Sequence, residues 1–218
     1  MNILAIETAT DFCSVALDTG GEILARERLA PRQHAELVVP WSNELLAEAG
    51  LGWSDIDGFA VSRGPGGFTS LRIGLSLVQG MALVGDRPVH PVGTLEVLAR
   101  AAWTGETEEW ILALLDARMG EVYSGWYRCS PAGIVPIDRE RVQPPQSLSV
   151  PEAAPWIAAG SGLAAWPEEV ASSTGLGLAD GRPDVWPDAR SLLALATGVE
   201  PVAAWGLEPI YVRDRVTG

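Results

Sequence analysis

Apolar and polar positions change their period several times along the first 92 residues. Short apolar or alternating runs have the length and period of strands, and two longer stretches have the period of amphipathic helices. A Gly20-Gly21 pair between the second and third runs has the composition of a hairpin turn. The pattern predicts strands at 2–8, 12–18 and 22–29, a helix at 33–49, a strand at 56–62, a helix at 69–84 and a strand at 87–92.

The order of these elements predicts the fold class. Three meandering strands followed by helix, strand, helix and strand is the order of a ribonuclease-H-like sheet, the half-unit of the actin-like ATPase and sugar-kinase (ASKHA) superfamily. A doubly wound nucleotide-binding fold would alternate strands and helices from its first strand. We therefore expect an α/β chain with an actin-like fold, two lobes and a mixed five-stranded sheet in the first lobe.

The second half of the chain is less regular. Its pattern predicts a helix at 94–103, antiparallel strands at 110–116 and 121–128, a strand at 156–161, a helix at 188–197 and an extended segment at 208–213. Six prolines between residues 129 and 155 predict loops with short edge strands. We expect an N-terminal lobe at 1–100 and a C-terminal, degenerate actin-like lobe at 101–218.

Composition restricts the classes of function. The 218 residues carry a formal net charge of −13, which disfavours unaided binding to nucleic acid, where Lys and Arg supply most of the affinity. All 15 basic residues are Arg, so the chain has no lysine for a P-loop or a Schiff base. Two widely separated cysteines, Cys13 and Cys129, exclude a disulfide framework and suit a reducing cytoplasm.

Targeting and membrane signals are absent from the sequence pattern. No run reaches the roughly 18–20 apolar residues of a membrane helix. The first ten residues, MNILAIETAT, contain an acid and lack the basic region of a signal peptide. We therefore expect a cytoplasmic protein without a membrane anchor.

His34 decides whether the first helix binds a metal. A helical metal site or a metallopeptidase requires two histidines one turn apart, as in HxxxH or HExxH, but Val38 occupies the second position. His90 lies in a proline-flanked strand, and no cluster of Cys or carboxylates completes a ligand set near either histidine. We expect no metal site and a hydrogen-bonded structural or capping role for His34.

Two segments lie where an actin-like fold binds phosphate. Thr8 and Thr10 bracket the first hairpin turn, but an alanine replaces the glycine that lets the backbone approach a phosphate. The other segment precedes the second helix, whose N-terminus favours an anion. It lacks the GxxxxGKS spacing, so close helix packing is the alternative role for its glycines, Gly64, Gly66 and Gly67.

The predicted hairpin at 110–128 contains a third candidate. Asp116 and Glu121 flank its turn, which includes Gly120. Two carboxylates can perform acid–base chemistry, but hairpin ends are commonly charged, so a structural role is the alternative. We treat Asp116 and Gly120, with the two loops above, as remnants of a nucleotide site, and we expect no catalytic residue and no cofactor.

The two helices of the first lobe are apolar over an unusually wide surface. The apolar side chains of 33–49 cover an arc of roughly 200°, whereas covering one sheet requires a stripe somewhat above about 100°. The second helix, 69–84, contains Gly74 and Gly80, which permit close approach, and has only a narrow polar strip: Thr69, Arg72, Ser76 and Gln79. Packing of the helices on each other is one explanation, and a protein partner is the other.

Five segments carry a resemblance to a known family: MNILAIETAT, SRGPGGFTSLRIG, LDARMGEVY, AGSGLAAWP and EPIYVR. In this order they resemble the bacterial TsaB (YeaZ) family of tRNA threonylcarbamoyladenosine (t6A) biosynthesis proteins over nearly the whole chain. Ser70 departs from the family pattern, which has glycine after Phe-Thr, and this changes only the loop geometry at the start of the second helix.

The resemblance implies an actin-like fold that has lost its catalytic residues. Members of the family pair with a catalytic paralogue of the TsaD family, which carries an HxxxH metal site and transfers threonylcarbamoyl to adenosine 37 of tRNAs reading codons that start with A. A small P-loop ATPase of the TsaE family completes the complex, tRNA is bound only through the complex, and a homodimer is an alternative assembly. The HxxxH positions of the paralogue correspond to His34 and Val38 in this chain.

The resemblance also implies where the partner binds. The contact in this family is made by the two helices of the first lobe, which are the two wide apolar helices here. The expected contact residues are Leu37, Val38, Trp41 and Leu45 on the first helix and Leu71, Arg72, Leu75, Val78 and Gln79 on the second.

Two other classes of function stay open. A self-sufficient actin-like ATPase or kinase would require an intact phosphate loop near residues 8–14. A metallopeptidase-like protein would require the second histidine that Val38 replaces.

Overall fold

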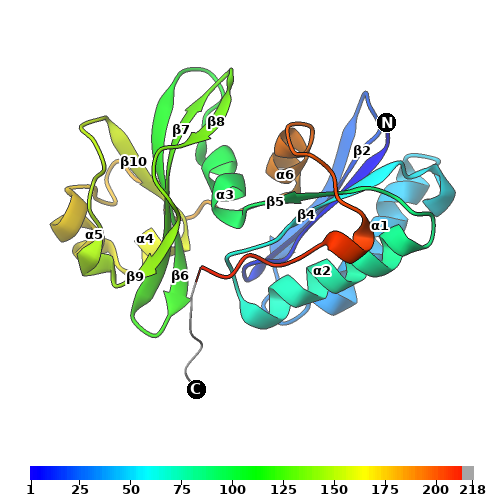
Figure 1. The fold of residues 1–218 in the computed structure, drawn as a ribbon, viewed down its shortest axis with the longest axis horizontal. Helices are drawn as coiled ribbons and strands as arrows, with labels where there is room; N and C mark the ends of the chain where they lie inside the picture. Colours follow the sequence, from blue (N-terminus) through cyan, green and yellow to red (C-terminus); the bar gives the residue numbers. More distant parts are fainter. Residues whose placement is uncertain (213–218) are drawn as a thin grey trace. The chain divides into compact units, whose positions relative to one another are not determined.

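The computed structural model describes residues 1–212, which divide into two compact units (Figure 1). The first unit contains Met1–Val97 and Pro187–Ile210, and the second contains Leu98–Trp186 with Tyr211 and Val212. The expected division after residue 100 lies three residues beyond the boundary at Val97, and residues 187–210, which were expected in the second lobe, belong to the first unit. None of the described helices has the length and apolar composition needed to cross a membrane.

The first unit is built on a five-stranded mixed sheet with the order β3-β2-β1-β4-β5. β1 pairs antiparallel with β2 and parallel with β4, and β4 pairs parallel with β5. This is the ribonuclease-H-like topology predicted from the order of the elements. The strands are β1 (Ile3–Glu7), β2 (Phe12–Asp18), β3 (Ile23–Leu29), β4 (Gly58–Ser62) and β5 (Val89–Val92).

Helices cover both faces of this sheet (Figure 1). Because side chains alternate along a strand, Leu4 and Ile6 lie in the core shared with α1 (His34–Glu48) and α2 (Phe68–Leu83). Ile3 and Ala5 lie in the other core, beneath α6 (Ala189–Ala196). A short 3₁₀ turn, η1 (Trp53–Asp55), connects α1 to β4.

The second unit begins within α3 (Thr94–Ala102) and contains another five-stranded sheet. The long strands β6 (Glu109–Arg118) and β7 (Glu121–Ser130) pair antiparallel, as predicted. β10 (Trp156–Ala159) and β8 (Gly133–Pro136) extend the sheet on either side, and β9 (Arg141–Gln143) also pairs with β7. The pattern did not predict η2 (Pro145–Ser147), α4 (Ser161–Ala165) or α5 (Pro167–Thr174).

Residues 199–210, which we call the strap, return along α2 after α6 (Figure 1). Val202 forms an isolated antiparallel bridge with Val89 of β5, and the 3₁₀ turn η3 (Ala204–Gly206) contacts α2. Ile210 donates its N–H to the Arg63 carbonyl over 2.7 Å. Residues 208–212 of the expected extended segment at 208–213 form no strand. The last residue of that segment, Arg213, lies outside the described residues.

Candidate functional site: closed phosphate loops and an open helix groove

The glycine-rich loop before α2 packs directly against the first hairpin turn. Gly67 donates its N–H to the Ala9 carbonyl over 2.7 Å, and Thr8 Oγ1 donates to the Ser70 carbonyl over 2.8 Å. A Cβ atom at Gly66 would overlap Ala9, and one at Gly74 would overlap Thr8. The glycines therefore permit contact between two backbone segments, which supports the packing role and leaves no room for a phosphate between Gly66 and Ala9.

The remaining loop residues also have partners within the chain. Thr10 Oγ1 accepts a hydrogen bond from the Phe12 N–H over 3.2 Å, which closes the turn locally. Gly64, with a φ of 108°, accepts at its carbonyl from the Thr94 N–H over 2.8 Å. A side chain at Gly64 would meet the Ile210 carbonyl of the strap at 2.7 Å.

Asp116 stabilises the β6–β7 hairpin. One carboxylate oxygen accepts the Arg118 N–H over 3.0 Å, and the other pairs with the Arg118 guanidinium at 3.1 Å. Arg118, Met119 and Gly120 all have positive φ, so the turn requires three left-handed residues in succession. Arg118 stands opposite Glu121 in the register. These contacts support the structural role of Asp116 and Gly120.

Glu7, at the end of β1, is a buried carboxyl that the sequence reasoning did not single out. Its side chain has no exposed surface, and its oxygens accept hydrogen bonds from the Ala9 N–H at 2.7 Å and from the Ser62 hydroxyl. Burial, assisted by the nearby Asp188 carboxylate, raises the pKa of Glu7 from 4.5 to about 7, although its hydrogen-bond donors act in the opposite direction. An acid within the apolar run ILAIE was the available signal.

His34 is the first residue of α1 and is almost fully buried. Neither ring nitrogen makes a hydrogen bond of good geometry, although the backbone of Thr10 and Phe12 lies close to the ring, and Gln33 occupies the N-cap position. Burial lowers the pKa of His34, and the nearby backbone of Thr10 opposes this effect. Among residues 1–212, no three His, Cys, Asp or Glu side chains lie close enough together to hold a metal.

Most of the expected contact residues on α1 and α2 lie inside the first unit. Val38, Leu45, Leu71, Leu75 and Val78 are buried in the core beneath the helices. Side chains with so little exposed surface have little area left for contact with a partner. These five residues support the helix surface from within.

The other four expected contact residues also pack within the chain. Leu37 and Trp41 are partly buried against the same core, and the Arg28 guanidinium lies 5.8 Å from the centre of the Trp41 ring. Arg72 stacks on Phe68 at 3.3 Å, and Gln79 binds the strap. Contacts with β2 and β3 therefore account for much of the wide apolar arc of α1.

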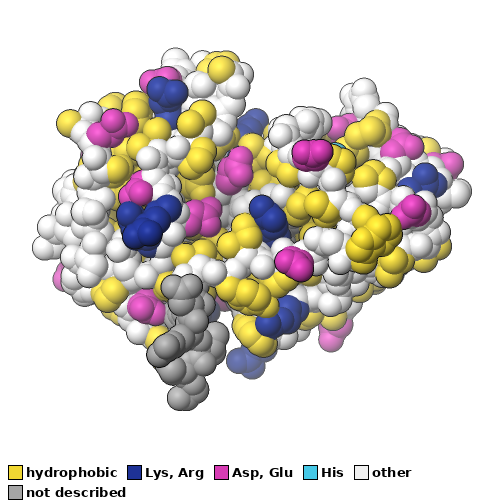
Figure 2. All heavy atoms as spheres, in the orientation of Figure 1, with side chains coloured by type: hydrophobic (Ala, Val, Ile, Leu, Met, Phe, Trp, Pro, Cys, Tyr) yellow, Lys and Arg dark blue, Asp and Glu magenta, His cyan; other side chains and the backbone are white. Residues whose placement is uncertain are grey.

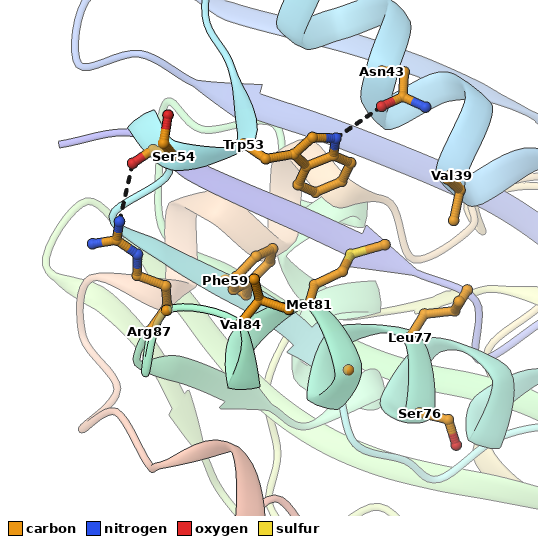
Figure 3. A pocket seen from close by; sticks show the side chains of 12 residues that line it. Val39, Asn43, Trp53, Ser54, Phe59, Ser76, Leu77, Met81, Val84 and Arg87 are labelled. Atoms are coloured by element: carbon orange, nitrogen blue, oxygen red, sulfur yellow. Dashed lines mark hydrogen bonds between the residues drawn. The ribbon is translucent and has the colours of Figure 1, made fainter.

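A groove of about 700 Å³ opens between α1, α2 and η1 (Figure 3). Val39 and Asn43 form its α1 wall, and Trp53 lies across it with its indole N–H donated to Asn43 Oδ1 over 2.9 Å. Arg87 stands at one end and donates to the Ser54 carbonyl over 3.0 Å. The α2 wall consists of Ser76, Leu77, Gly80, Met81 and Val84. The groove is therefore mostly apolar, with a few polar groups fixed at its edges.

Exposed apolar side chains gather around α2. Val84 is 88% exposed, and Trp205 on the strap is 74% exposed. Phe68, Leu83 and Trp53 are the other large apolar side chains exposed in this region. Figure 2 shows apolar surface over α2 and η3. α2 itself carries no carboxylate, although the chain has a net charge of −13, so this surface combines apolar exposure with low negative charge.

The groove lies on the two helices that the sequence analysis singled out, but its lining contains none of the nine expected contact residues. On a helical wheel, Val39 and Asn43 lie about 180° from Trp41. The repeat Ser76, Gly80 and Val84, with four-residue spacing, was the signal for the outer face of α2. Trp53 lies in a turn, where helical periodicity gives no prediction.

The topology and the loops together define a class of protein. The chain has the actin-like ASKHA fold, and its phosphate-loop segments are packed against each other. The family model described as "TsaD: tRNA N6-adenosine threonylcarbamoyltransferase" matches residues 24–152.

Individual relatives define the family more narrowly. The tRNA threonylcarbamoyladenosine biosynthesis protein TsaB of Escherichia coli is 37% identical over 99% of this chain and 96% of its own length. The solved structure of YeaZ from Pseudomonas aeruginosa superposes with a TM-score of 0.88 at 37% identity, covering 96% of this chain and 99% of that one. The chain belongs to the TsaB (YeaZ) family of t6A biosynthesis proteins.

Part of the chain also resembles the transferases named in the same modification. A tRNA N6-adenosine threonylcarbamoyltransferase of Syntrophobacter fumaroxidans is 36% identical over 80 residues, which is 37% of this chain and 24% of that protein.

Proposed function

We propose that this chain is a non-catalytic subunit in the threonylcarbamoylation of adenosine 37 of tRNAs that read codons starting with A. Its role is to bind and support the catalytic TsaD-type paralogue. The observation that carries the proposal is the apolar groove between α1 and α2, in a chain whose family acts in t6A biosynthesis. An exposed apolar surface of this kind on a globular protein is typical of a protein contact.

The state of the phosphate loops supports a non-catalytic role. The glycine-rich loop donates to the Ala9 carbonyl instead of presenting its N–H group to an anion. The sequence supplies no lysine, and the carboxylate of Asp116 is already engaged by its own hairpin. A self-sufficient ATPase or kinase would require these groups to face a nucleotide.

The relationship to the transferase family supports the choice of partner. Residues 24–152, which match the TsaD family model, include α1, η1 and α2. Related subunits commonly associate through equivalent surfaces, as in two-fold symmetric dimers. We therefore propose that the helix pair of this chain packs against the corresponding pair of a TsaD-type subunit, and that a second copy of this chain competes for the same surface.

The remaining assignments follow from charge and chemistry. A net charge of −13 leaves tRNA contact to other subunits. A small P-loop ATPase of the TsaE type would supply the nucleotide chemistry that this chain lacks. Cys13 and Cys129 are both buried and neither forms a disulfide in the described structure, in keeping with a reducing cytoplasm, where we place the protein.

Reconstitution with a steric block in the groove tests this function. A Cβ atom at Gly80 meets nothing within 4 Å, so Gly80→Trp should fold normally and fill the groove from the α2 wall. We expect loss of the complex with the TsaD-type subunit, and loss of t6A formation when all components and tRNA are supplied. Gly21→Trp is a matched control, because Gly21 is also open but lies in the β2–β3 turn.

Omission of single components tests the assignment of catalysis. t6A formation should require both this chain and the TsaD-type subunit, whereas this chain alone should bind ATP with a Kd of about 1 mM or weaker. Low-micromolar ATP binding with turnover by the isolated chain would instead establish a self-sufficient ATPase.

A further inference from the structure

The strap places a large aromatic side chain beside the proposed partner surface. η3 contacts α2, and Trp205 at the centre of η3 is 74% exposed. Its neighbours Ala204 and Leu207 are buried in the core of the first unit. The strap is therefore held against the core, and Trp205 is its large apolar side chain that faces outward.

The size of the groove requires additional contact area. The groove is lined by 12 residues, of which Phe59 is only 2% exposed. A stable protein–protein interface uses about 20–30 residues on each side and about 800 Å² per partner. A partner held by the groove alone would fall short of this area, so the interface extends beyond it.

The two flanks of the groove differ in chemistry. Beyond α1, Arg26 pairs with Glu44 at 3.4 Å and with Glu48 at 2.6 Å, so that flank is polar and already satisfied. Beyond α2 lies η3, whose three residues are Ala204, Trp205 and Gly206 and carry no charge. An interface gains more from covering the apolar flank, because no ion pair has to be desolvated there.

We infer that the partner surface continues across α2 onto the strap, and that Trp205 is an anchor for the TsaD-type subunit. The inference rests on the proposed function, because it takes the same partner and extends the same surface. Tryptophan is enriched among the residues that dominate binding energy, since it buries a large area at a small cost in conformational entropy.

Gln79 acts through Trp205 as a positioning residue. Its Nε2 donates to the Ala204 carbonyl over 3.3 Å and to the Leu207 carbonyl over 3.1 Å. These two bonds hold both ends of η3 against α2. Glutamate has nearly the same shape but no N–H donor at neutral pH, so Gln79→Glu would replace both bonds with repulsion between a carboxylate and two carbonyl oxygens.

Measured affinities for the purified TsaD-type subunit test the inference. Trp205→Ala should weaken the Kd by about 30-fold, the loss expected for an aromatic anchor that becomes buried in an interface. Its melting temperature should stay near that of the wild type, because the side chain is mostly exposed. Leu29→Ala on β3 truncates another exposed apolar side chain away from α2 and should leave the Kd unchanged.

A double-mutant cycle separates positioning from general stability. Gln79→Glu should weaken binding in the wild-type background and should have no further effect in the Trp205→Ala background. Hydrogen exchange of residues 203–208 should become faster in Gln79→Glu alone. Equal losses in both backgrounds would contradict the positioning role.

The outcomes distinguish the inference from the proposed function. If Gly80→Trp abolishes binding and Trp205→Ala leaves the Kd unchanged, the groove proposal holds and the strap inference is wrong. If Gly80→Trp leaves binding intact, the proposed partner surface itself is wrong.

Discussion

The two faces of α2 differ in the space around their glycines. On the inner face, a Cβ atom at Gly74 would overlap the hydroxyl of Thr8, because the helix is pressed against the end of β1. On the outer face, a Cβ atom at Gly80 meets nothing within 4 Å. The first glycine is required by the fold, whereas nothing within the chain requires the second.

The inner face of α2 is packed as part of the fold, whereas its outer face is available to a partner. Around Gly74, the first turn and the glycine-rich loop are packed together and hydrogen-bonded to each other. Around Gly80, by contrast, the described chain leaves a groove open and several apolar side chains exposed. The segment at which actin-like ATPases bind phosphate is thus used for packing, and the helix surface beside it stays open.

The same difference between a packed and an open face should hold for α1, and a charge introduced on its inner face should have the largest effect. Leu45 has no exposed surface and lies in the main core. Leu45→Glu should therefore destabilise the first unit by more than about 4 kcal/mol, through the lost packing and a buried, unpaired charge. Urea denaturation followed by circular dichroism should show an unfolded or strongly destabilised protein.

Val39→Glu is the matched change on the groove wall. Val39 is partly exposed, so this variant should keep its urea midpoint and lose affinity for the TsaD-type subunit. A folded Leu45→Glu variant that fails to bind would reverse the assignment of the two faces and restore Leu45 as a contact residue.

The sequence predicted the fold, but it did not indicate which side chains line the groove. Every strand of the first sheet followed from apolar periodicity, because buried strands and amphipathic helices leave a strong pattern in the sequence. The same periodicity could not distinguish Trp41, which packs partly on the core and lies under Arg28, from Val39, which faces the groove. The distinction depends on α2, η1 and β3, which are distant in sequence and packed on different sides of α1.

Two further features could not be predicted from the sequence because they depend on tertiary contacts. The return of 187–210 to the first unit depends on which sheet α6 covers, and the apolar pattern of α6 fits either sheet. Gln79 was among the contact residues that the family resemblance implied. The strap that it binds carries no regular secondary structure apart from η3.

The stability of the first unit should also depend on pH, because Glu7 is buried beside the packed loops. The folded state holds a proton on Glu7 up to about pH 7, whereas the unfolded chain releases it near pH 4.5. The free energy of unfolding should therefore fall as pH rises from 4.5 to 7, by on the order of 3 kcal/mol for this group. The group's contribution is fully present below pH 4.5.

Glu7→Gln isolates this contribution from the other carboxylates. Arg182 holds the pKa of Glu109 below its usual range. The contribution of Glu109 to the free energy of unfolding therefore decreases as pH falls, which is opposite to the effect of Glu7. The difference in urea midpoint between wild type and Glu7→Gln should change steadily between pH 5 and pH 7. A difference that is independent of pH would show that Glu7 ionises normally in the folded protein.

Alanine at the two glycines of α2 gives a smaller and more direct comparison. Gly74→Ala should destabilise the protein by about 1–3 kcal/mol, because the added methyl group overlaps Thr8. Gly80→Ala should stabilise it by up to about 1 kcal/mol, since alanine has the higher helix propensity and the site is open. Thermal unfolding of both variants measures the signs, and equal signs would contradict the difference between the faces.

The smallest effect is expected at Asp116, the carboxylate with the most obvious chemistry in the second unit. The Arg118 side chain is 74% exposed, so its ion pair with Asp116 contributes little. Asn at this position retains an oxygen to accept the Arg118 N–H and thus preserves the turn. Asp116→Asn should change the free energy of unfolding by less than about 0.5 kcal/mol and the rate of t6A formation by less than about twofold. A loss of modification with the complex still assembled would give Asp116 a role in the chemistry and refute the assignment of catalysis to the partner alone.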